Sequence, residues 1–214
     1  MIEYTVKVDN DKTEWYLNDE RHREDGPAVI WKNGDKEWYL NGKRHREDGP
    51  AMEYANGDKK WFLNDKYHRI NGPAIEWLNG SKSWYLNGRI HRENGPACEL
   101  INGHKEWWLN NKLHRKNGPA IERVDGTKEW YLNGERHRID GPAKEHINGY
   151  KEWWLNSDLH RIDGPAIECL NGYKEWWLNG KQVKEEVIEK KVYTKEDLGK
   201  MTLEEIFNIV SKKS

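Results

Sequence analysis

Residues 36–51 read KEWYLNGKRHREDGPA, and variants of this stretch return through most of the chain. Residues 59–74 read KKWFLNDKYHRINGPA and residues 82–97 read KSWYLNGRIHRENGPA, so successive copies begin 23 residues apart. The tryptophans keep this spacing without insertion or deletion, at Trp15, Trp38, Trp61, Trp84, Trp107, Trp130, Trp153 and Trp176. A fixed period of this length is typical of proteins that stack one small structural unit many times.

The copies align with one another, which separates constant positions from variable ones. Counted from each tryptophan as position 0, an aromatic residue stands at position 1, leucine at position 2 and asparagine at position 3. His-Arg occupies positions 7 and 8 and Gly-Pro-Ala positions 11 to 13 in the first seven copies, and all seven prolines of the chain lie there. Constant positions report the architecture, and variable positions are where function is sought.

The residue types of each copy predict β-strands joined by turns. Residues 36–40 alternate with period two and are rich in aromatic residues, which predicts one strand, and residues 51–55 are expected to form a second. Asn33-Gly34 and Asn41-Gly42 are dipeptides that favour tight hairpin turns. We expect the tight turns along one edge of the sheet and the longer His-Arg segments along the other. A short third strand within KRHR is an open alternative.

Composition limits the class of protein. Only 35% of the 214 residues are hydrophobic, and the aromatic share is carried by 13 Trp and 10 Tyr against 2 Phe. The net charge is −1, which gives no general attraction for nucleic acid or an anionic membrane. The start of the chain has no apolar signal region, and no run approaches membrane-spanning length. We therefore expect a cytoplasmic protein, in the host cytoplasm if its source is a phage or virus, that binds neither nucleic acid nor membrane.

The period ends at Gly180. We predict a β-repeat array over residues 1–180, with eight tryptophan-headed units of which seven are complete, and a separate tail over residues 181–214. In the tail, Leu203, Ile206, Phe207 and Val210 have helical spacing, and Thr202 with Glu205 forms a capping box. An amphipathic helix there is expected to cap the last open unit, and docking of a partner is the alternative.

The signature W-Y-L-N-G-x-x-H-R-x-D/N-G-P-A, which covers residues 15–180, resembles MORN repeats, and in particular the variant class found in phages, giant viruses and bacteria. The resemblance implies an all-β fold, an elongated twisted antiparallel β-meander of 23-residue units, and a binding or scaffolding role. Bacterial relatives in this class include YwqK-type antitoxins, which neutralise partner proteins. The chain departs from the commoner MORN unit by carrying His-Arg and Gly-Pro-Ala where that unit has a Gly-x-Gly run.

Catalysis, a cofactor and a metal site are not expected. An enzyme needs one asymmetric cluster of side chains, whereas this chain offers the same side chains seven times, and it has no phosphate-binding glycine loop. At two strands per copy, neighbouring histidines of the ladder would lie about 9.5 Å apart. That separation is too large for them to share an ion whose ligands sit about 2.0–2.1 Å from it.

The recurring His-Arg pairs, which we call the ladder, have two interpretations. The functional one is an edge that binds an anionic ligand such as a nucleotide, because arginine offers a planar fork for phosphate. The structural one has histidine tying the long connection by ring hydrogen bonds while arginine stacks on tryptophan or pairs with acids. The structural interpretation is favoured, because Val183-Lys184 replaces the pair in the last copy. The ladder residues singled out are His45, Arg46, His68, Arg69, His91, Arg92, His114, Arg115, His137 and Arg138.

Positions 6 and 9 flank the ladder and vary between charged and apolar residues. A stripe of apolar side chains there, on a connection expected to face solvent, is a candidate surface for a protein partner; scattered apolar residues are the alternative. Its members are Tyr67, Ile70, Ile90, Leu113, Ile139, Leu159 and Ile162. The sequence thus predicts a non-enzymatic binding protein, antitoxin-like or a phage or viral inhibitor of a host protein. Anion sequestration and a self-assembling, homo-oligomeric scaffold are the alternatives.

Overall fold

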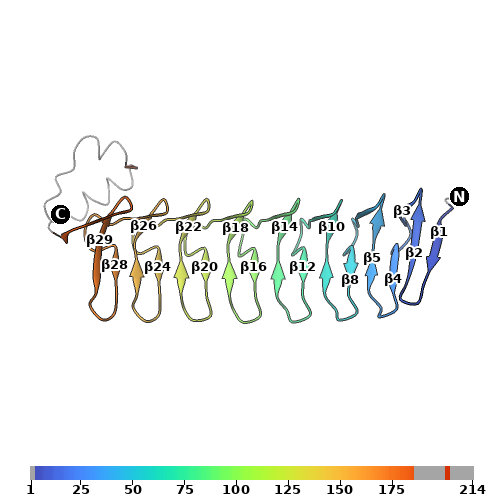
Figure 1. Cartoon of the computed structure of the whole chain (residues 1–214), viewed down its shortest axis with the longest axis horizontal. Coiled ribbons are helices and arrows are strands. Elements are labelled where there is room, and N and C mark those ends of the chain that lie inside the picture. The colour runs from blue at the N-terminus through green and yellow to red at the C-terminus, as the bar shows by residue number, and fades with distance from the viewer. Residues whose placement is uncertain (1–2, 186–200, 203–214) are drawn as a thin grey trace. The chain divides into compact units, whose positions relative to one another are not determined.

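The computed structural model describes residues 3–185 and 201–202. The chain forms two compact units, Met1–Lys112 and Leu113–Ser214. Each unit is an antiparallel meander of short strands (Figure 1), so the expected all-β meander is confirmed. The helix predicted from Leu203 onward lies outside the described residues.

The first unit contains one principal sheet whose strands follow chain order. Each strand pairs antiparallel with the next one named. In order they are β1 (Thr5–Val8), β2 (Lys12–Leu17), β4 (Val29–Trp31), β5 (Lys36–Glu37), β8 (Met52–Glu53), β9 (Lys59–Lys60), β12 (Ile75–Glu76), β13 (Lys82–Ser83), β16 (Cys98–Glu99) and β17 (Lys105–Glu106).

Small hairpins branch from this sheet at the edge that carries the ladder. The end of β2 pairs with β3 (Glu20–Arg21), and three further hairpins repeat this arrangement. They are β6 (Tyr39–Leu40) with β7 (Lys43–Arg44), β10 (Phe62–Leu63) with β11 (Lys66–Tyr67), and β14 (Tyr85–Leu86) with β15 (Arg89–Ile90). Strand β18 (Trp108–Leu109) belongs to this unit, and β19 (Lys112–Leu113) contains the boundary between the two units.

The second unit repeats the same plan. Its principal strands are β20 (Ile121–Glu122), β21 (Lys128–Glu129), β24 (Lys144–Glu145), β25 (Lys151–Glu152), β28 (Ile167–Glu168) and β29 (Lys174–Leu178). Its hairpins are β22 (Tyr131–Leu132) with β23 (Glu135–Arg136), β26 (Trp154–Leu155) with β27 (Asp158–Leu159), and β29 with β30 (Lys181–Val183).

The single strand expected over residues 36–40 is divided at Trp38. The Trp38 N–H donates to the Ala51 carbonyl, on the side of the principal sheet, whereas the Trp38 carbonyl accepts from the His45 N–H in the small hairpin. The chain therefore changes sheets at this residue, and the short third strand left open by the sequence is present as β7. This division occurs because the two-residue turn at Asn41-Gly42 folds residues 39–40 back onto residues 43–44.

The core is thin. The alanine at position 13 has 0% exposure in all seven copies, where the next strand begins behind the tryptophan. Ala28, Val29 and Tyr39 form a buried cluster with Trp31 packed against it. The other buried hydrophobic residues are Phe62, Ile75, Ile121 and Leu178, and the tryptophans are partly buried, which is consistent with the low hydrophobic content of the chain.

Asn41 and Gly42 have φ values of 49° and 70°, so the hairpin turn requires two left-handed residues. Position 4 is glycine at Gly88 but asparagine at Asn111, where φ is 65°. We predict that Gly88→Asn leaves the free energy of unfolding nearly unchanged, whereas Gly88→Val lowers it by about 1–2 kcal/mol, because a β-branched residue strains the left-handed conformation. Urea denaturation of both variants measures the difference. Equal losses would show that the turn conformation does not limit stability.

Candidate binding surfaces

The ladder arginines lie between a tryptophan ring and the Gly-Pro backbone. The Arg46 guanidinium carbon is 4.1 Å from the ring centroid of Trp38. Its Nη1 donates to the Pro50 carbonyl at 3.2 Å and to Glu53 at 3.0 Å, and its Nε donates to Asp48 at 2.9 Å. The stack recurs for Arg23, Arg69, Arg92, Arg138 and Arg161 with their tryptophans, at 3.8 to 4.3 Å. The stacking and acid pairing expected from the structural interpretation are therefore present.

Glycine at position 11 leaves the space that the guanidinium fills. A Cβ atom at Gly49 would lie 2.7 Å from Cζ of Arg46, and one at Gly72 would lie 3.0 Å from Cζ of Arg69. The backbone φ is not positive at either glycine, so space and not conformation excludes a side chain there. The motif Gly-Pro-Ala is thus explained in parts: glycine admits the arginine, the proline carbonyl accepts its hydrogen bond, and alanine is buried behind the tryptophan.

We predict that Gly72→Ala lowers the free energy of unfolding by about 1–3 kcal/mol, because the new methyl group overlaps the guanidinium of Arg69. The same substitution in an Arg69→Ala background should cost much less, since the overlapping group is gone. A double-mutant cycle measured by urea denaturation separates these terms. Additive losses would mean that glycine serves another purpose at this position.

The ladder histidines connect each copy to the next. Nδ1 of His68 is 2.9 Å from the side-chain amide of Asn87, and the Asn87 backbone N–H donates to the same nitrogen at 3.2 Å. The nearer atom of the Asn87 amide is Oδ1, so the tautomer of the His68 ring decides which of the two contacts is the hydrogen bond, and either one joins this copy to the next.

The last copy has no following copy to hold, and its ladder positions are Val183 and Lys184. The final contact of this type is the Asn179 N–H donating to His160 at 3.1 Å. Binding of an anion by the ladder would require arginine donors that already serve proline carbonyls and carboxylates in the fold. The geometry therefore gives the ladder a structural task, and anion binding stays a prediction.

Position 6 lies between aromatic rings of successive copies. The ring centroid of Tyr67 is 4.3 Å from that of Phe62 and 5.2 Å from that of Tyr85. Arg136 occupies the equivalent place, with its guanidinium carbon 5.5 Å from the Tyr131 ring and 5.0 Å from the Trp154 ring. Arginine and aliphatic residues can replace one another at position 6 because both kinds of side chain can pack against aromatic faces.

The expectation that the apolar stripe faces solvent is therefore wrong at position 6, where Tyr67, Ile90, Leu113 and Leu159 are half-buried. Position 6 pairs across the hairpin with the aromatic at position 1, as in Tyr85 with Ile90, and its side chain packs beside that ring. At position 9, Ile139 and Ile162 are also half-buried, and Ile70 alone of the seven is exposed, at 78%. The structure does not gather these residues into one exposed stripe.

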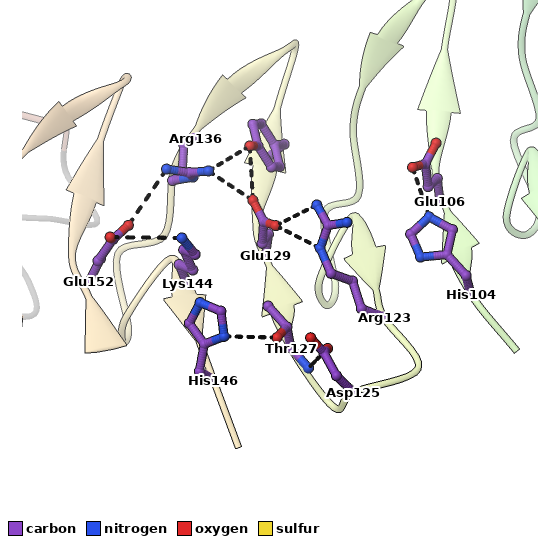
Figure 2. Close-up of polar contacts among 11 residues, drawn as sticks. His104, Glu106, Arg123, Asp125, Thr127, Glu129, Arg136, Lys144, His146 and Glu152 are labelled. Atoms are coloured by element: carbon purple, nitrogen blue, oxygen red, sulfur yellow. Dashed lines mark hydrogen bonds and ion pairs between the residues drawn. The ribbon is translucent and has the colours of Figure 1, made fainter. Parts of the chain in front are cut away.

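A row of buried carboxylates lies at position 22, which the sequence analysis did not single out. Figure 2 shows Glu129 between two arginines. It accepts from Nε and Nη2 of Arg123 at 3.1 and 2.9 Å, from Nη2 of Arg136 at 2.8 Å, and from the Tyr131 hydroxyl at 3.1 Å. Its side chain is only 6% exposed. The carboxylate is fully partnered, as a buried charge must be.

Where position 22 is glutamate its donors change from copy to copy, and two copies carry Lys60 and Ser83 there instead. Glu152 accepts from the Tyr150 hydroxyl at 2.5 Å and from Nε1 of Trp154 at 2.8 Å, and the Lys144 ammonium lies 3.9 Å away. Arg136 of the same copy lies 3.6 Å from Glu152 (Figure 2), and Trp154 at position 1 of the following copy donates where that copy has Leu159 at position 6. The repeated glutamate indicates this row, but the donors that satisfy it could not be assigned without the register of the strands.

Burial raises the pKa of Glu129, and the hydrogen bonds from Arg123 and Arg136 outweigh burial, so its pKa is lowered from the ordinary value of 4.5. A carboxyl group whose pKa falls on folding stabilises the fold above its unfolded pKa, and this contribution is lost as pH falls through the folded value. We predict that Glu129→Gln costs about 1–3 kcal/mol at pH 7. The difference from wild type should shrink below about pH 4.5, as measured by urea denaturation at a series of pH values. A difference independent of pH would contradict the ion pairing.

The exposed aliphatic residues gather instead at position 17, next to the tight turns. In the first unit they are Leu78 (72% exposed) and Ile101 (69%), and in the second unit Val124 (62%), Ile147 (83%) and Leu170 (81%). We call these five residues the turn-tip row. Sequence reasoning missed it because position 17 ends the predicted second strand, and the variable positions considered for binding were those that flank the ladder. Alignment of the copies carries the signal, because position 17 is a large aliphatic residue in five consecutive copies.

Leu78 and Ile101 in the first unit, and Ile147 and Leu170 in the second, each lie over the turn of the preceding copy. The Leu78 N–H donates to Asp58 at 2.7 Å, and its Cδ1 is 3.1 Å from where a Cβ of Gly57 would be. In the second unit, Ile147 lies over Gly126 in the same way, at 3.4 Å. The backbone of the row is thus held in place while its side chains stay in solvent. Beside Leu170 lies an open hollow of about 480 Å³ lined by His146, Asn148, Tyr150, Cys169 and Asn171.

Other chemistry is sparse in the described part of the chain. No three His, Cys, Asp or Glu residues there are grouped so that they could hold a metal ion. Cys98 and Cys169 are free thiols, and burial raises the pKa of Cys98, which makes it a weak nucleophile at neutral pH. No helix among these residues is long and apolar enough to cross a membrane.

Comparison with known proteins gives no assignment. No family model matches the chain, and no curated protein matches it.

Proposed function

We propose that the chain is a non-enzymatic binding protein that contacts another protein through its turn-tip row. The observation that carries the proposal is the exposure of Val124, Ile147 and Leu170 on neighbouring turns of the second unit, at 62 to 83%. A partner that covers such side chains gains about 1.5–3 kcal/mol for each one fully buried. Leu78 and Ile101 offer the same kind of contact in the first unit.

The fold does not require aliphatic residues at position 17. The first two copies carry Lys32 and Ala55 there, and the Ala55 N–H makes the same hydrogen bond to the preceding turn, to Asp35 at 2.7 Å, that the Leu78 N–H makes to Asp58. The backbone contact holds the turn, and the side chain is available for another purpose. Because the fold does not need them, the exposed aliphatic residues at position 17 of the later copies favour a binding role.

The finer assignment rests on the sequence. The signature of residues 15–180 is similar to that of MORN-type repeats, and this similarity supports an array that inhibits a partner by covering part of its surface. An antitoxin-like protein, or a phage or viral inhibitor of a host protein, is the class that we propose. Neutral overall charge favours a protein over a nucleic acid as the partner.

We predict that the double variant Ile147→Lys and Leu170→Lys keeps its free energy of unfolding within about 0.5 kcal/mol per substitution, because both side chains are exposed and lysine occurs naturally at position 17. The variant should lose the proteins that the wild type retains from a lysate of its host cell, as measured by affinity capture and mass spectrometry.

Ile70→Lys is the matched control, because it adds the same charge at a site that is 78% exposed and lies on the ladder edge. The control should retain the partner. If Ile70→Lys loses the partner while the double variant keeps it, the binding surface lies on the ladder edge instead. If both variants keep it, the turn-tip row has no role in binding.

A further inference from the structure

The two ends of the principal strand order present different edges. Strand β1 is exposed at all four residues, and within the described residues it pairs only with β2. At the other end, Lys174–Glu175 of β29 pairs with β28 through Glu168 and Ile167. In the described part of the chain no strand pairs with the opposite side of Lys174 and Glu175. Unpaired strand edges of this kind are templates for pairing with another chain.

The register shows which strand type stands at each end. In β1, Lys7 faces Glu14 and Val8 faces Thr13. This matches an interior pair in which Met52 faces Lys60 and Glu53 faces Lys59. Strand β1 therefore occupies the place of positions 14 and 15 of a preceding copy. Strand β29 begins with positions 21 and 22.

Inside the protein, these two strand types are neighbours. Strand β5 presents positions 21 and 22 to positions 14 and 15 of β8, with Lys36 facing Glu53 and Glu37 facing Met52. The edge of Lys174–Glu175 that pairs with no strand among the described residues is thus the edge that normally receives a strand of the β1 type. Strands β1 and β29 are complementary halves of a contact that the interior makes repeatedly.

The charges agree with the register. If β1 of one copy adds to β29 of another in the interior register, Lys7 faces Glu175 of that copy and Val8 faces Lys174. Lys7 then lies between two glutamates, its own Glu14 and the Glu175 of its neighbour. Lys144 has this arrangement within the second unit, since it faces Glu129 on one side and Glu152 on the other.

Val8 also has an interior precedent. The usual residue at position 15 is glutamate, but the first copy has Ile30, which faces Lys36 on one side and Thr13 on the other. Val8 already faces Thr13 in β1 and would face Lys174 in the neighbouring copy. A β-branched residue between threonine and lysine is thus compatible with this sheet.

We propose that copies of this chain associate head to tail, with the outer edge of β1 of one copy pairing antiparallel with the free edge of β29 of the next. The contact is heterologous, because the two surfaces differ, so each bound copy presents a new end to another. This use of the ends is independent of the turn-tip row and goes beyond the proposed function.

The test uses the full chain in analytical ultracentrifugation over a range of concentrations. The weight-average mass of the wild type should rise with concentration and fall again when salt screens the charged pairs. Lys7→Glu and Glu175→Lys should each weaken association by roughly tenfold or more, because each places like charges opposite one another at the contact. Tryptophan fluorescence and thermal melting confirm that both variants are folded.

Mixing the two variants gives the decisive result. In an equimolar mixture every contact between unlike copies pairs opposite charges, so association should return to nearly the wild-type level. Each variant keeps one wild-type end, so a merely destabilised end strand would recover only as far as the heterodimer, whereas opposite charges at both kinds of contact allow growth beyond it. A wild type that is monomeric at every concentration overturns the proposal. So does association that both substitutions leave unchanged, because copies would then meet through another surface such as the turn-tip row.

Discussion

The fold depends on one stacking interaction, the arginine guanidinium held between the indole of position 0 and the Gly-Pro backbone of the same copy. The Arg46 guanidinium stacks on the Trp38 ring and donates hydrogen bonds to Asp48, Pro50 and Glu53. No other side chain offers a flat cation with that set of donors. The stack fixes the path of the long connection, which in turn places alanine behind the tryptophan and starts the next strand. A chain with little aliphatic content can therefore fold, because planar groups supply the contact area that a thick core would supply elsewhere.

Much of the principal architecture could be predicted from the sequence because turns are local. The Asn33-Gly34 dipeptide encodes the turn between β4 and β5, where the φ of Gly34 is 97°, and the antiparallel pairing of these two principal strands follows from it. The division of the tryptophan strand was not predicted, because residues 36–40 alternate in the same way whether they all belong to one sheet or are divided between two. Only the direction of the Trp38 N–H and carbonyl distinguishes the two cases.

The candidate surfaces were less predictable for a related reason. Ile90 looked exposed because charged residues occupy the same position in other copies, yet Arg44 there packs against Tyr39 and Phe62. A charged residue does not mark a solvent-facing position when aromatic faces lie on both sides of it. Conversely, Leu170 stands at the position that ends the predicted second strand, yet its side chain is 81% exposed. In this protein the burial of a side chain depends on its contacts with neighbouring copies, so it cannot be judged from the sequence of one copy.

The contacts that hold the copies together are short in sequence. In the described part of the chain, side-chain hydrogen bonds join residues no more than 21 positions apart, as from Arg44 to Asp65 and from Ile90 to Asn111. Forming such contacts closes only small loops, so folding has a low entropic barrier and can start in any group of neighbouring copies. The same locality means that a terminal copy can open while its neighbours stay closed. We therefore expect amide hydrogen exchange in this protein to depend on distance from the nearest end of the array more than on burial of the individual amide.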